Sequence, residues 1–313
     1  MRKNARLERR LKLHDLRVLM TVIQAGSMLK AAQRLNTSQP AVSRSIAELE
    51  HVLDVRLLDR SRQGVQPTIY GRALLDCGTA VFDELRQGVK NIEFLADPAE
   101  GELRIGASLP AFSGVVPATI KRLRREHPRI RIQTNFMSDV RQQQRALRER
   151  ALDFVVGRLP SALEKDFEAE TLFQEGLVVI AGAHNPWLRR RKIQLADLIG
   201  EPWLLPPGDS EGGSLVAQAF RASGLDLPRN SIATDSLMYL QSLITGGDFL
   251  ACYPSSPIRL GTTGPGFRVL PVNLPIVPSP FGIIRFKNRT LSPVAELFIA
   301  CARDVVKPLT RGR

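Results

Sequence analysis

The sequence predicts an α+β protein of several domains, with a winged helix-turn-helix at its amino end, one long helix after it, and an α/β region. Three observations predict this arrangement. Residues 26–53 contain two short amphipathic helices that meet at a polar turn, residues 69–95 run as one helix without proline, and strands alternate with helices beyond a break at 97–101. We place the domain boundaries at 1–67, 68–97 and 98–313.

The composition is that of a globular protein whose positive charge favours binding to a polyanion. The 313 residues have room for two or three domains, and the 43% of hydrophobic residues can supply a core in each. The net charge of +13 attracts polyanions without sequence preference. Residues 1–62 carry 13 Lys and Arg against 6 Asp and Glu, so the basic excess concentrates at the helix-turn-helix.

The sequence indicates neither secretion nor membrane insertion. Cys77, Cys252 and Cys301 are odd in number and far apart, which favours neither a disulfide framework nor a zinc module. The basic amino end leads into KLHDLR rather than an apolar segment, and no apolar run approaches the about 20 residues of a membrane span. We therefore expect a cytoplasmic protein that does not bind membranes.

The first two helices have the pattern of a helix-turn-helix. Apolar residues recur at helical spacing in each one: Met28, Ala31, Ala32 and Leu35 in the first, then Val42, Ile46, Leu49 and Leu53 in the second. Ser38 is a natural N-cap, and Pro40 is tolerated in a first helical turn. A helix from 13 to 24 would cover the pair and complete a small core.

The outer face of the second helix favours DNA binding over an ordinary helical hairpin. Its amino-terminal part offers donors to base edges and phosphates and has no acid before Glu48. The candidate DNA-binding residues on this helix and its cap are Ser38, Gln39, Pro40, Ser43 and Arg44.

A short hairpin follows over 54–68, with Gly64 at its tip. Arg60 and Arg62 on it would lie against phosphates or the minor groove beside the second helix, which makes the hairpin a wing. A solvated loop is the alternative.

The stretch from Leu13 to Arg60 resembles the LysR-type transcriptional regulators. The resemblance is carried by AAQRLNTSQPAVSRSIAELE at 31–50 and LDRSRQGVQPTIYG at 58–71, and it continues more weakly in the hydrophobic pattern to the carboxyl end. This chain has Leu58 where the family usually has Phe. The resemblance implies a sequence-specific regulator that binds double-stranded DNA as a homodimer or homotetramer, responds to a small effector, and contacts RNA polymerase.

The long helix needs a partner for its apolar stripe. Glycines at 71, 78 and 88 lie on a seam with the coiled-coil period, where they would allow close approach. In the resemblance this helix pairs with the same helix of a second subunit, and packing on its own domain is the alternative. The candidate dimer-interface residues are Leu74, Val81, Phe82, Leu85, Val89 and Ile92.

Beyond the break, alternating strands and helices predict a parallel sheet covered by helices. The pattern occurs twice, which is similar to the two-lobed, periplasmic-binding-protein-like effector domain of LysR regulators. Ligands of open α/β sheets bind beyond the carboxyl ends of strands, where ordinary strand-to-helix connections also lie. The candidate residues for a small polar or anionic effector at such ends are Ser108, Leu109, Pro110, Ser138, Pro206 and Tyr253.

No catalytic constellation is present in the sequence. There is no G-x-S-x-G, P-loop, dinucleotide glycine fingerprint or H-E-x-x-H, and the four histidines are scattered, so we expect no catalytic residues, cofactor or metal. The predicted function is a LysR-type regulator controlled by an effector. The alternative is a small-molecule-binding or enzymatic α/β domain with an accessory DNA-binding head.

Overall fold

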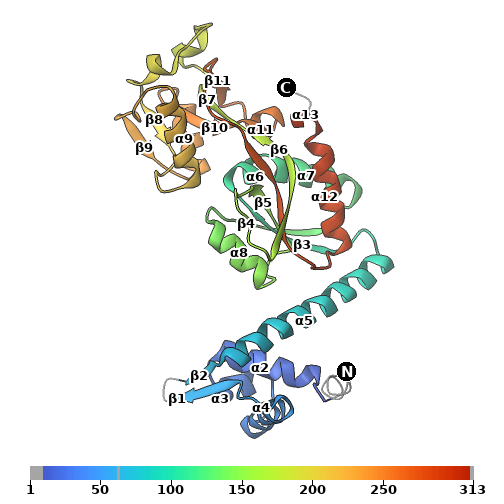
Figure 1. Ribbon diagram of the computed structural model, residues 1–313. Helices are drawn as coiled ribbons and strands as arrows, with labels where there is room; N and C mark the ends of the chain where they lie inside the picture. Colours follow the sequence, from blue (N-terminus) through green and yellow to red (C-terminus); the bar gives the residue numbers. More distant parts are fainter. Residues whose placement is uncertain (1–9, 62–63, 311–313) are drawn as a thin grey trace. The chain divides into compact units, whose positions relative to one another are not determined.

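The computed structural model describes residues 10–61 and 64–310 and divides into two compact units, one up to Val89 and one from Lys90 onward (Figure 1). Each unit is described by itself. No helix in the described part of the chain is long and apolar enough to cross a membrane.

The first unit is the predicted winged helix-turn-helix. Its elements are α2 (Leu13–Ala25), α3 (Met28–Arg34), α4 (Gln39–Leu53), β1 (Leu58–Ser61), β2 (Gly64–Pro67) and the first part of α5 (Ile69–Ala96). The strands β1 and β2 pair antiparallel, as a wing requires. The residues at helical spacing form one core, in which Leu19, Ala31 and Ile46 are fully buried. Leu58 is also buried in it, so an apolar side chain is kept where the family has Phe.

Polar side chains determine where α4 begins and where the wing sits. The Ser38 hydroxyl accepts a hydrogen bond from the Ala41 amide at 3.4 Å, which caps α4. The Glu50 carboxylate, near the other end of α4, accepts from the Leu57 amide at 2.7 Å and the Leu58 amide at 3.3 Å. The start of the wing is therefore tied to α4.

Two glycines of α5 face the protein's own core rather than a partner helix. A Cβ built on Gly71 would lie 2.1 Å from the Leu57 carbonyl oxygen, and one on Gly78 would lie 3.0 Å from Met20 Sδ. The helix can approach the helical core this closely only where it has no side chain. For these two positions the expected seam against a second subunit is wrong, and the alternative of packing on the same domain holds.

The second unit has two lobes, each built on a five-stranded sheet. In lobe one the strand order is β4-β3-β5-β12-β6, from β3 (Glu102–Ala107), β4 (Arg131–Phe136), β5 (Phe154–Arg158), β6 (Phe167–Glu175) and β12 (Ser279–Phe286). Its helices are α6 (Leu109–Ser113), α7 (Val115–Glu126), α8 (Val140–Arg148), α12 (Pro293–Val305) and α13 (Lys307–Thr310).

Lobe two has the order β11-β7-β10-β8-β9, from β7 (Leu177–Gly182), β8 (Trp203–Leu205), β9 (Ser231–Ala233), β10 (Leu250–Pro254) and β11 (Phe267–Val269). Its helices are α9 (Glu211–Ala222), α10 (Leu237–Thr245) and α11 (Ser255–Arg259), with 3-10 turns η1 (Pro186–Arg189) and η2 (Leu195–Leu198). The chain crosses between the lobes from β6 to β7 and again from β11 to β12.

The predicted parallel sheet is confirmed for three strands of each lobe, and the other strands make both sheets mixed. Strands β4, β3 and β5 are parallel, as are β10, β8 and β9, whereas β12 and β6, and β7 and β11, pair antiparallel. Strand β12 runs antiparallel to β5 where the chain re-enters lobe one from lobe two. The strand β6 is an element that the sequence pattern did not indicate.

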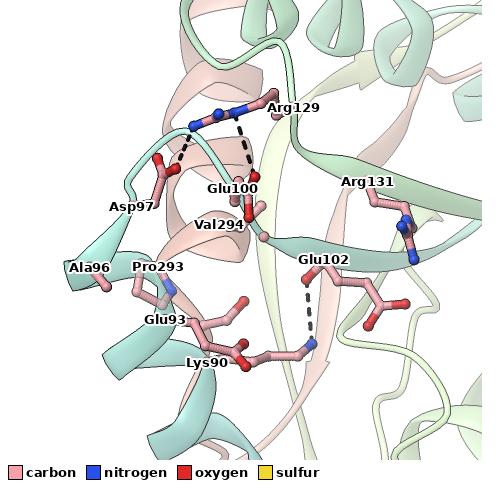
Figure 2. Close-up of a pocket in the computed structure, with 12 residues that line it drawn as sticks. Lys90, Glu93, Ala96, Asp97, Glu100, Glu102, Arg129, Arg131, Pro293 and Val294 are labelled. Atoms are coloured by element: carbon pink, nitrogen blue, oxygen red, sulfur yellow. Dashed lines mark hydrogen bonds and ion pairs between the residues drawn. The ribbon is translucent and has the colours of Figure 1, made fainter.

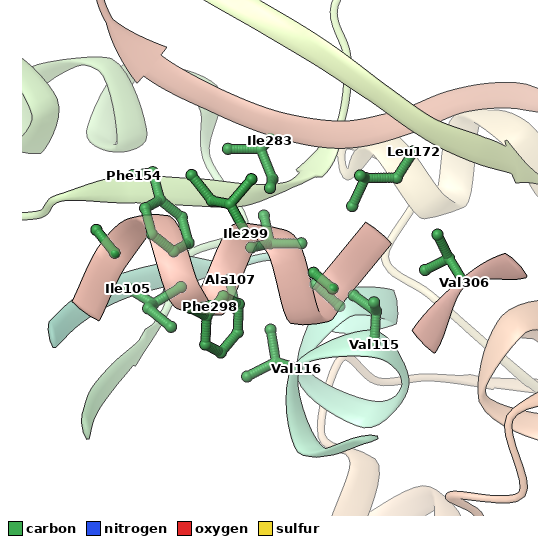
Figure 3. Close-up of a cluster of buried hydrophobic side chains, with 14 of the residues drawn as sticks. Ile105, Ala107, Val115, Val116, Phe154, Leu172, Ile283, Phe298, Ile299 and Val306 are labelled. Atoms are coloured by element: carbon green, nitrogen blue, oxygen red, sulfur yellow. The ribbon is translucent and has the colours of Figure 1, made fainter. Parts of the chain in front are cut away.

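Helices cover both faces of the lobe-one sheet. Phe154 and Val156 of β5 point into a core with α7 and α12, where the Phe154 and Phe298 rings lie 5.5 Å apart (Figure 3). Val155, between them, points to the opposite face and packs with Leu147 of α8. This alternation follows from the two-residue period of a strand, and since both faces are covered, residues 154–156 of β5 are all apolar.

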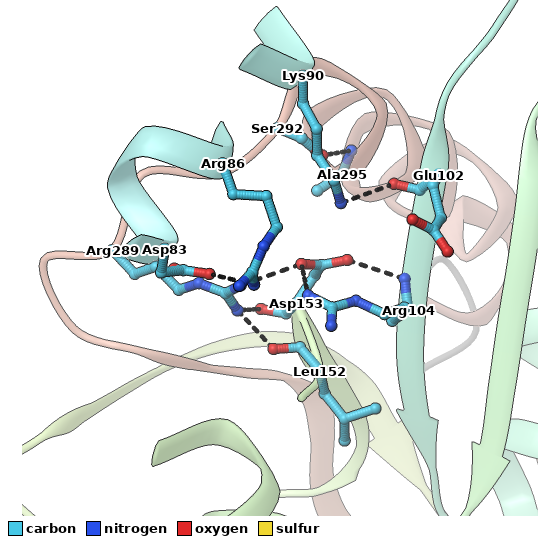
Figure 4. Close-up of polar contacts among 10 residues, drawn as sticks. All are labelled: Asp83, Arg86, Lys90, Glu102, Arg104, Leu152, Asp153, Arg289, Ser292 and Ala295. Carbon is cyan, nitrogen blue, oxygen red and sulfur yellow. Dashed lines mark hydrogen bonds and ion pairs between the residues drawn. The ribbon is translucent and has the colours of Figure 1, made fainter. Parts of the chain in front are cut away.

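A buried ion pair in lobe one joins the residue before β5 to the segment after β12. The Asp153 and Arg289 side chains are 2% and 1% exposed, and Arg289 Nη2 lies 3.2 Å from Asp153 Oδ1 (Figure 4). The Arg104 amide donates to Asp153 Oδ2 at 2.8 Å, and Arg289 also donates to the Leu152 carbonyl. Each charge is therefore satisfied within the lobe.

Candidate DNA-binding surface and effector cleft

The structure presents the candidate DNA-binding residues together at the amino end of α4. Ser38, Gln39 and Pro40 are exposed there, Arg44 is exposed one turn later, and Ser43 is half-buried. A helix end with exposed donors can enter a major groove because no other element covers its outer face in the described unit. The role of these residues in DNA binding stays a prediction.

The wing, whose start is bonded to Glu50 near the carboxyl end of α4, carries Arg60. This residue is exposed on β1 and is paired in register with Val65 of β2. The Val65 amide donates to the Gly26 carbonyl at 3.0 Å, so β2 is seated on the end of α2. Gly64 has a φ of +121°, which favours glycine. The predicted contact residue Arg62 lies outside the described residues.

All six candidate effector residues line one cavity of about 130 Å³ between the lobes. Lobe one contributes Ser108, Leu109 and Pro110 after β3 and Ser138 after β4, and lobe two contributes Pro206 after β8 and Tyr253 in β10. The carboxyl ends of the parallel strands in the two sheets therefore face the same space, which is where open α/β sheets bind ligands. The structure brings these residues together, and their contact with an effector stays a prediction.

Sequence reasoning missed the charged residues of this cavity. Arg158 ends β5, and Glu211 begins α9, and both line the cavity with Asp235 and Thr234. Arg158 and Thr234 carry the same signal as Ser108, because Arg158 ends β5 and Thr234 directly follows β9. Glu211 carries no such signal, because α9 starts after the Ser210 cap with Glu-Gly-Gly, where no apolar period indicates a helix.

Arg158 and Glu211 form an ion pair across the cleft. Arg158 Nε lies 2.9 Å from Glu211 Oε1, and the side chains are 13% and 47% exposed. Burial lowers the pKa of Arg158, while the charges of Glu211 and Glu175 oppose that shift. Burial raises the pKa of Glu211, and the charge of Arg158 opposes it. The desolvation of both groups thus exceeds what their attraction restores.

Three further side chains of the cavity that carry a hydroxyl or a thiol are buried. Ser108 is 8% exposed, and its hydroxyl has no hydrogen-bond partner among the residues that the structure describes. Burial raises the pKa of Tyr253, against a hydrogen bond with Ser113 that lowers it. Burial raises the pKa of the Cys252 thiol to about 12, so this cysteine stays protonated at neutral pH.

A larger hollow of about 590 Å³ lies near the start of the second unit, and two of its cations already bond to other lining residues. Figure 2 shows Arg129 bonded to Asp97 and Glu100, and Lys90 donating to the Glu102 carbonyl at 3.3 Å. The surrounding side chains leave no buried polar group directed at a ligand in the described lining. The interlobe cavity is therefore the candidate site despite its smaller volume.

The apolar stripe of α5 is exposed toward its carboxyl end. Leu85 is 50% exposed, Val89 54% and Ile92 69%, while Val81 and Phe82 are half-buried. Leu74 packs partly on the core of the first unit. Of the candidate dimer residues, Leu74 thus contacts the core of its own unit, whereas Leu85, Val89 and Ile92 present an apolar surface. The role of all six in dimerisation stays a prediction.

Comparison with known proteins identifies the class of protein that this fold and these surfaces define. Residues 13–72 match the bacterial regulatory helix-turn-helix protein of the lysR family, and residues 96–307 match the LysR substrate binding domain. The chain belongs to the LysR family, and it is a DNA-binding transcriptional regulator with an effector-binding domain.

Individual relatives extend the match over nearly the whole chain. The regulator GbpR of Azospirillum brasilense is 29% identical and covers 95% of this chain and 87% of its own. The SDS degradation transcriptional activation protein of a Pseudomonas strain is 30% identical over 91% of this chain and 93% of its own. Full-length OxyR from Pseudomonas aeruginosa has the same fold, with a TM-score of 0.65 at 23% identity over 97% of this chain and 99% of its own. CbnR complexed with its target DNA also shares the fold, with a TM-score of 0.53 at 22% identity over 95% and 100%.

Proposed function

We propose that residues 1–67 bind DNA, residues 68–97 mediate dimerisation and residues 98–313 bind the effector. The observation that carries this proposal is the interlobe cavity, because six residues selected for their places at the ends of four strands line one space. A ligand there contacts both lobes and can favour one arrangement of them. Binding then changes operator affinity, the bend of the DNA and the contact with RNA polymerase.

DNA is held by the exposed end of α4 and by the wing. Gln39 reaches base edges, Arg44 reaches a base or phosphate, and Ser43 and Arg60 contact the backbone. The basic excess of the amino-terminal residues adds attraction without sequence preference. Each pair of chains, in a homodimer or a homotetramer, places two such helices on one operator.

The cleft binds its ligand without transforming it. Among the described residues of the lining, the ionisable ones are Arg158, Glu211, Asp235, Cys252 and Tyr253. Arg158 and Glu211 are paired, and the thiol and phenol are held protonated by burial. Such groups can orient a polar molecule but lack an activated nucleophile.

The DNA-binding proposal is tested on a duplex selected from random sequences with the full chain. Gln39→Ala and Arg44→Ala should each weaken binding by about 1–3 kcal/mol at fixed salt. Arg125→Ala, which removes one exposed positive charge from α7, is the matched control and should bind like the parent. If both α4 variants bind like the parent, the assignment of α4 is wrong.

A further inference from the structure

The Arg158–Glu211 pair joins the two lobes inside the proposed effector cleft. Arg158 ends β5 of lobe one, and Glu211 is the first residue of α9 in lobe two. Their side chains meet at 2.9 Å and both line the cavity. A ligand that enters the cavity therefore meets a contact that already holds the lobes together.

Arg158 and Glu211 differ in how well solvent can compensate their charges when the ion pair breaks. Arg158 is 13% exposed and stays charged, so without Glu211 its buried guanidinium loses its ion-pair partner and keeps only part of its compensation, from the charge of Glu175. Glu211 is 47% exposed and can recover hydration by turning toward solvent. The free-energy cost of replacing Glu211 with another anion is consequently small. The cost of leaving Arg158 with no anion beside it is large.

The Ser108 hydroxyl, next to Arg158, is a second group that a ligand oxygen could accept a hydrogen bond from. The Ser108 hydroxyl is buried and has no partner among the described residues. A Cβ built on Gly157, the residue before Arg158, would lie 3.1 Å from Ser108 Oγ, so the hydroxyl lies against the backbone next to Arg158. A buried hydroxyl without a partner carries a free-energy cost that a ligand oxygen can remove.

The rest of the lining is largely apolar. Its side chains from both lobes include Leu109, Phe136, Leu204, Val216, Leu240 and Tyr253. The remaining acid, Asp235, is exposed, so water screens its charge. The cavity thus combines one buried cation and one buried hydroxyl with walls suited to hydrocarbon.

We propose that the effector is a small organic carboxylate with an apolar body, whose carboxylate displaces Glu211 from Arg158 and accepts a hydrogen bond from Ser108. This inference rests on the proposed effector cleft and deepens it. The carboxylate of Glu211 shows the chemistry that Arg158 accepts, since a planar guanidinium matches a planar carboxylate. Release of Glu211 removes the interlobe ion pair, so binding both fills the cleft and unlatches lobe two from lobe one.

The test is calorimetry on the full chain with butanoate, hexanoate and octanoate, each compared with its primary amide. The best carboxylate should bind about tenfold more tightly than its amide, because hydrogen bonds to charged groups are the stronger ones. Glu211→Gln should tighten carboxylate binding about tenfold by removing the competing anion. Arg158→Met should abolish the preference for the carboxylate over the amide.

Glu168→Gln is the matched control. Glu168 pairs with Arg285 at 2.8 Å and is 43% exposed, which nearly reproduces the geometry of Glu211 away from the cleft, and its loss should leave binding unchanged. Ser108→Ala should weaken carboxylate binding, which supplies a second readout if Arg158→Met does not fold.

Three results would overturn the inference: no carboxylate is bound, the amides bind as well as the acids, or Glu211→Gln binds no more tightly than Glu168→Gln. The same preparations are tested on the selected DNA duplex. Intact DNA binding with any of these results rejects the carboxylate and leaves the proposed DNA-binding function standing. Failure to select or bind DNA rejects that function instead.

Discussion

Asp153 illustrates how one buried residue supports the effector domain. It receives a hydrogen bond from the Arg104 amide and pairs with Arg289, whose side chain is 1% exposed. A buried pair of this kind contributes little relative to an apolar replacement of both partners, but the removal of one partner leaves an unpaired buried charge.

Asp153→Ala should therefore destabilise the second unit by about 3–5 kcal/mol, because the buried Arg289 loses its ion pair with Asp153. Urea denaturation followed by circular dichroism measures the change. Glu149→Ala removes the exposed partner of Arg145 and should leave the midpoint within error of the parent. A midpoint for Asp153→Ala equal to that of Glu149→Ala would show that the buried pair is not required.

At this scale, the sequence predicted the residues that follow a strand but not those that depend on a helix start. Ser108, Ser138 and Tyr253 could be selected because a short apolar run identifies the end of a strand. Glu211 could not, because its helix begins with Glu-Gly-Gly, where no apolar period indicates a helix. The pairing of Arg158 with Glu211 depends on the approach of two lobes, which no local pattern contains.

Among the elements, α12 is clamped to β6 by an exposed bidentate pair. Arg303 Nε and Nη2 lie 2.6 and 2.8 Å from the two Glu170 oxygens. The hydrogen bond from Arg303 is the main cause that lowers the pKa of Glu170 below its ordinary value of 4.5 in the folded protein. The carboxylate form is thus favoured by folding.

This pair gives the second unit a defined acid sensitivity. Since the pKa of Glu170 is lower in the folded state, its stabilising effect is fully present above pH 4.5 and is lost as the pH falls through the folded pKa. Glu170→Gln should lower the urea midpoint at pH 7, and the difference from the parent should shrink below pH 4.5. Glu201→Gln, outside this pair, is the control. A difference that persists unchanged at lower pH would contradict the ionic origin of the effect.

The exposed stripe of α5 leads to a prediction about assembly. Leu85, Val89 and Ile92 are each at least half exposed, an apolar surface that favours association. Leu85→Glu should weaken self-association and operator binding together, as measured by light scattering and by DNA titration of the full chain. Ala73→Glu adds the same charge at an exposed position of α5 outside the stripe and is the control. If Leu85→Glu assembles like Ala73→Glu, the stripe is not the interface.

Elements were predictable where their periodicity was strong. The helix at 13–24 and the two helices within 26–53 were found because their apolar spacing is regular, and the Ser38 cap marks the start of the second of that pair. The strand β6 was missed because FEAETLFQE mixes acids with apolar residues at an edge of the sheet. Two of the glycines of α5 were also not assigned correctly. Their spacing in the sequence does not distinguish packing against the core of the same unit from packing against the helix of a second subunit.

For the whole molecule, the central claim is that occupancy of the interlobe cleft changes operator binding. The chain crosses between the lobes twice, and the cleft lies between their facing strand ends. A ligand can shift DNA affinity only by its own preference for one arrangement of the protein, so the coupling should be about 1–3 kcal/mol.

The most direct measurement is a titration of the selected operator with the full chain, in the absence of the best-binding carboxylate and at its saturation, for the parent and for Arg158→Met. The account predicts that the carboxylate changes the operator affinity of the parent by about 5- to 150-fold and leaves that of Arg158→Met unchanged. An equal change in both proteins, or no change in the parent at saturation of the cleft, would contradict it.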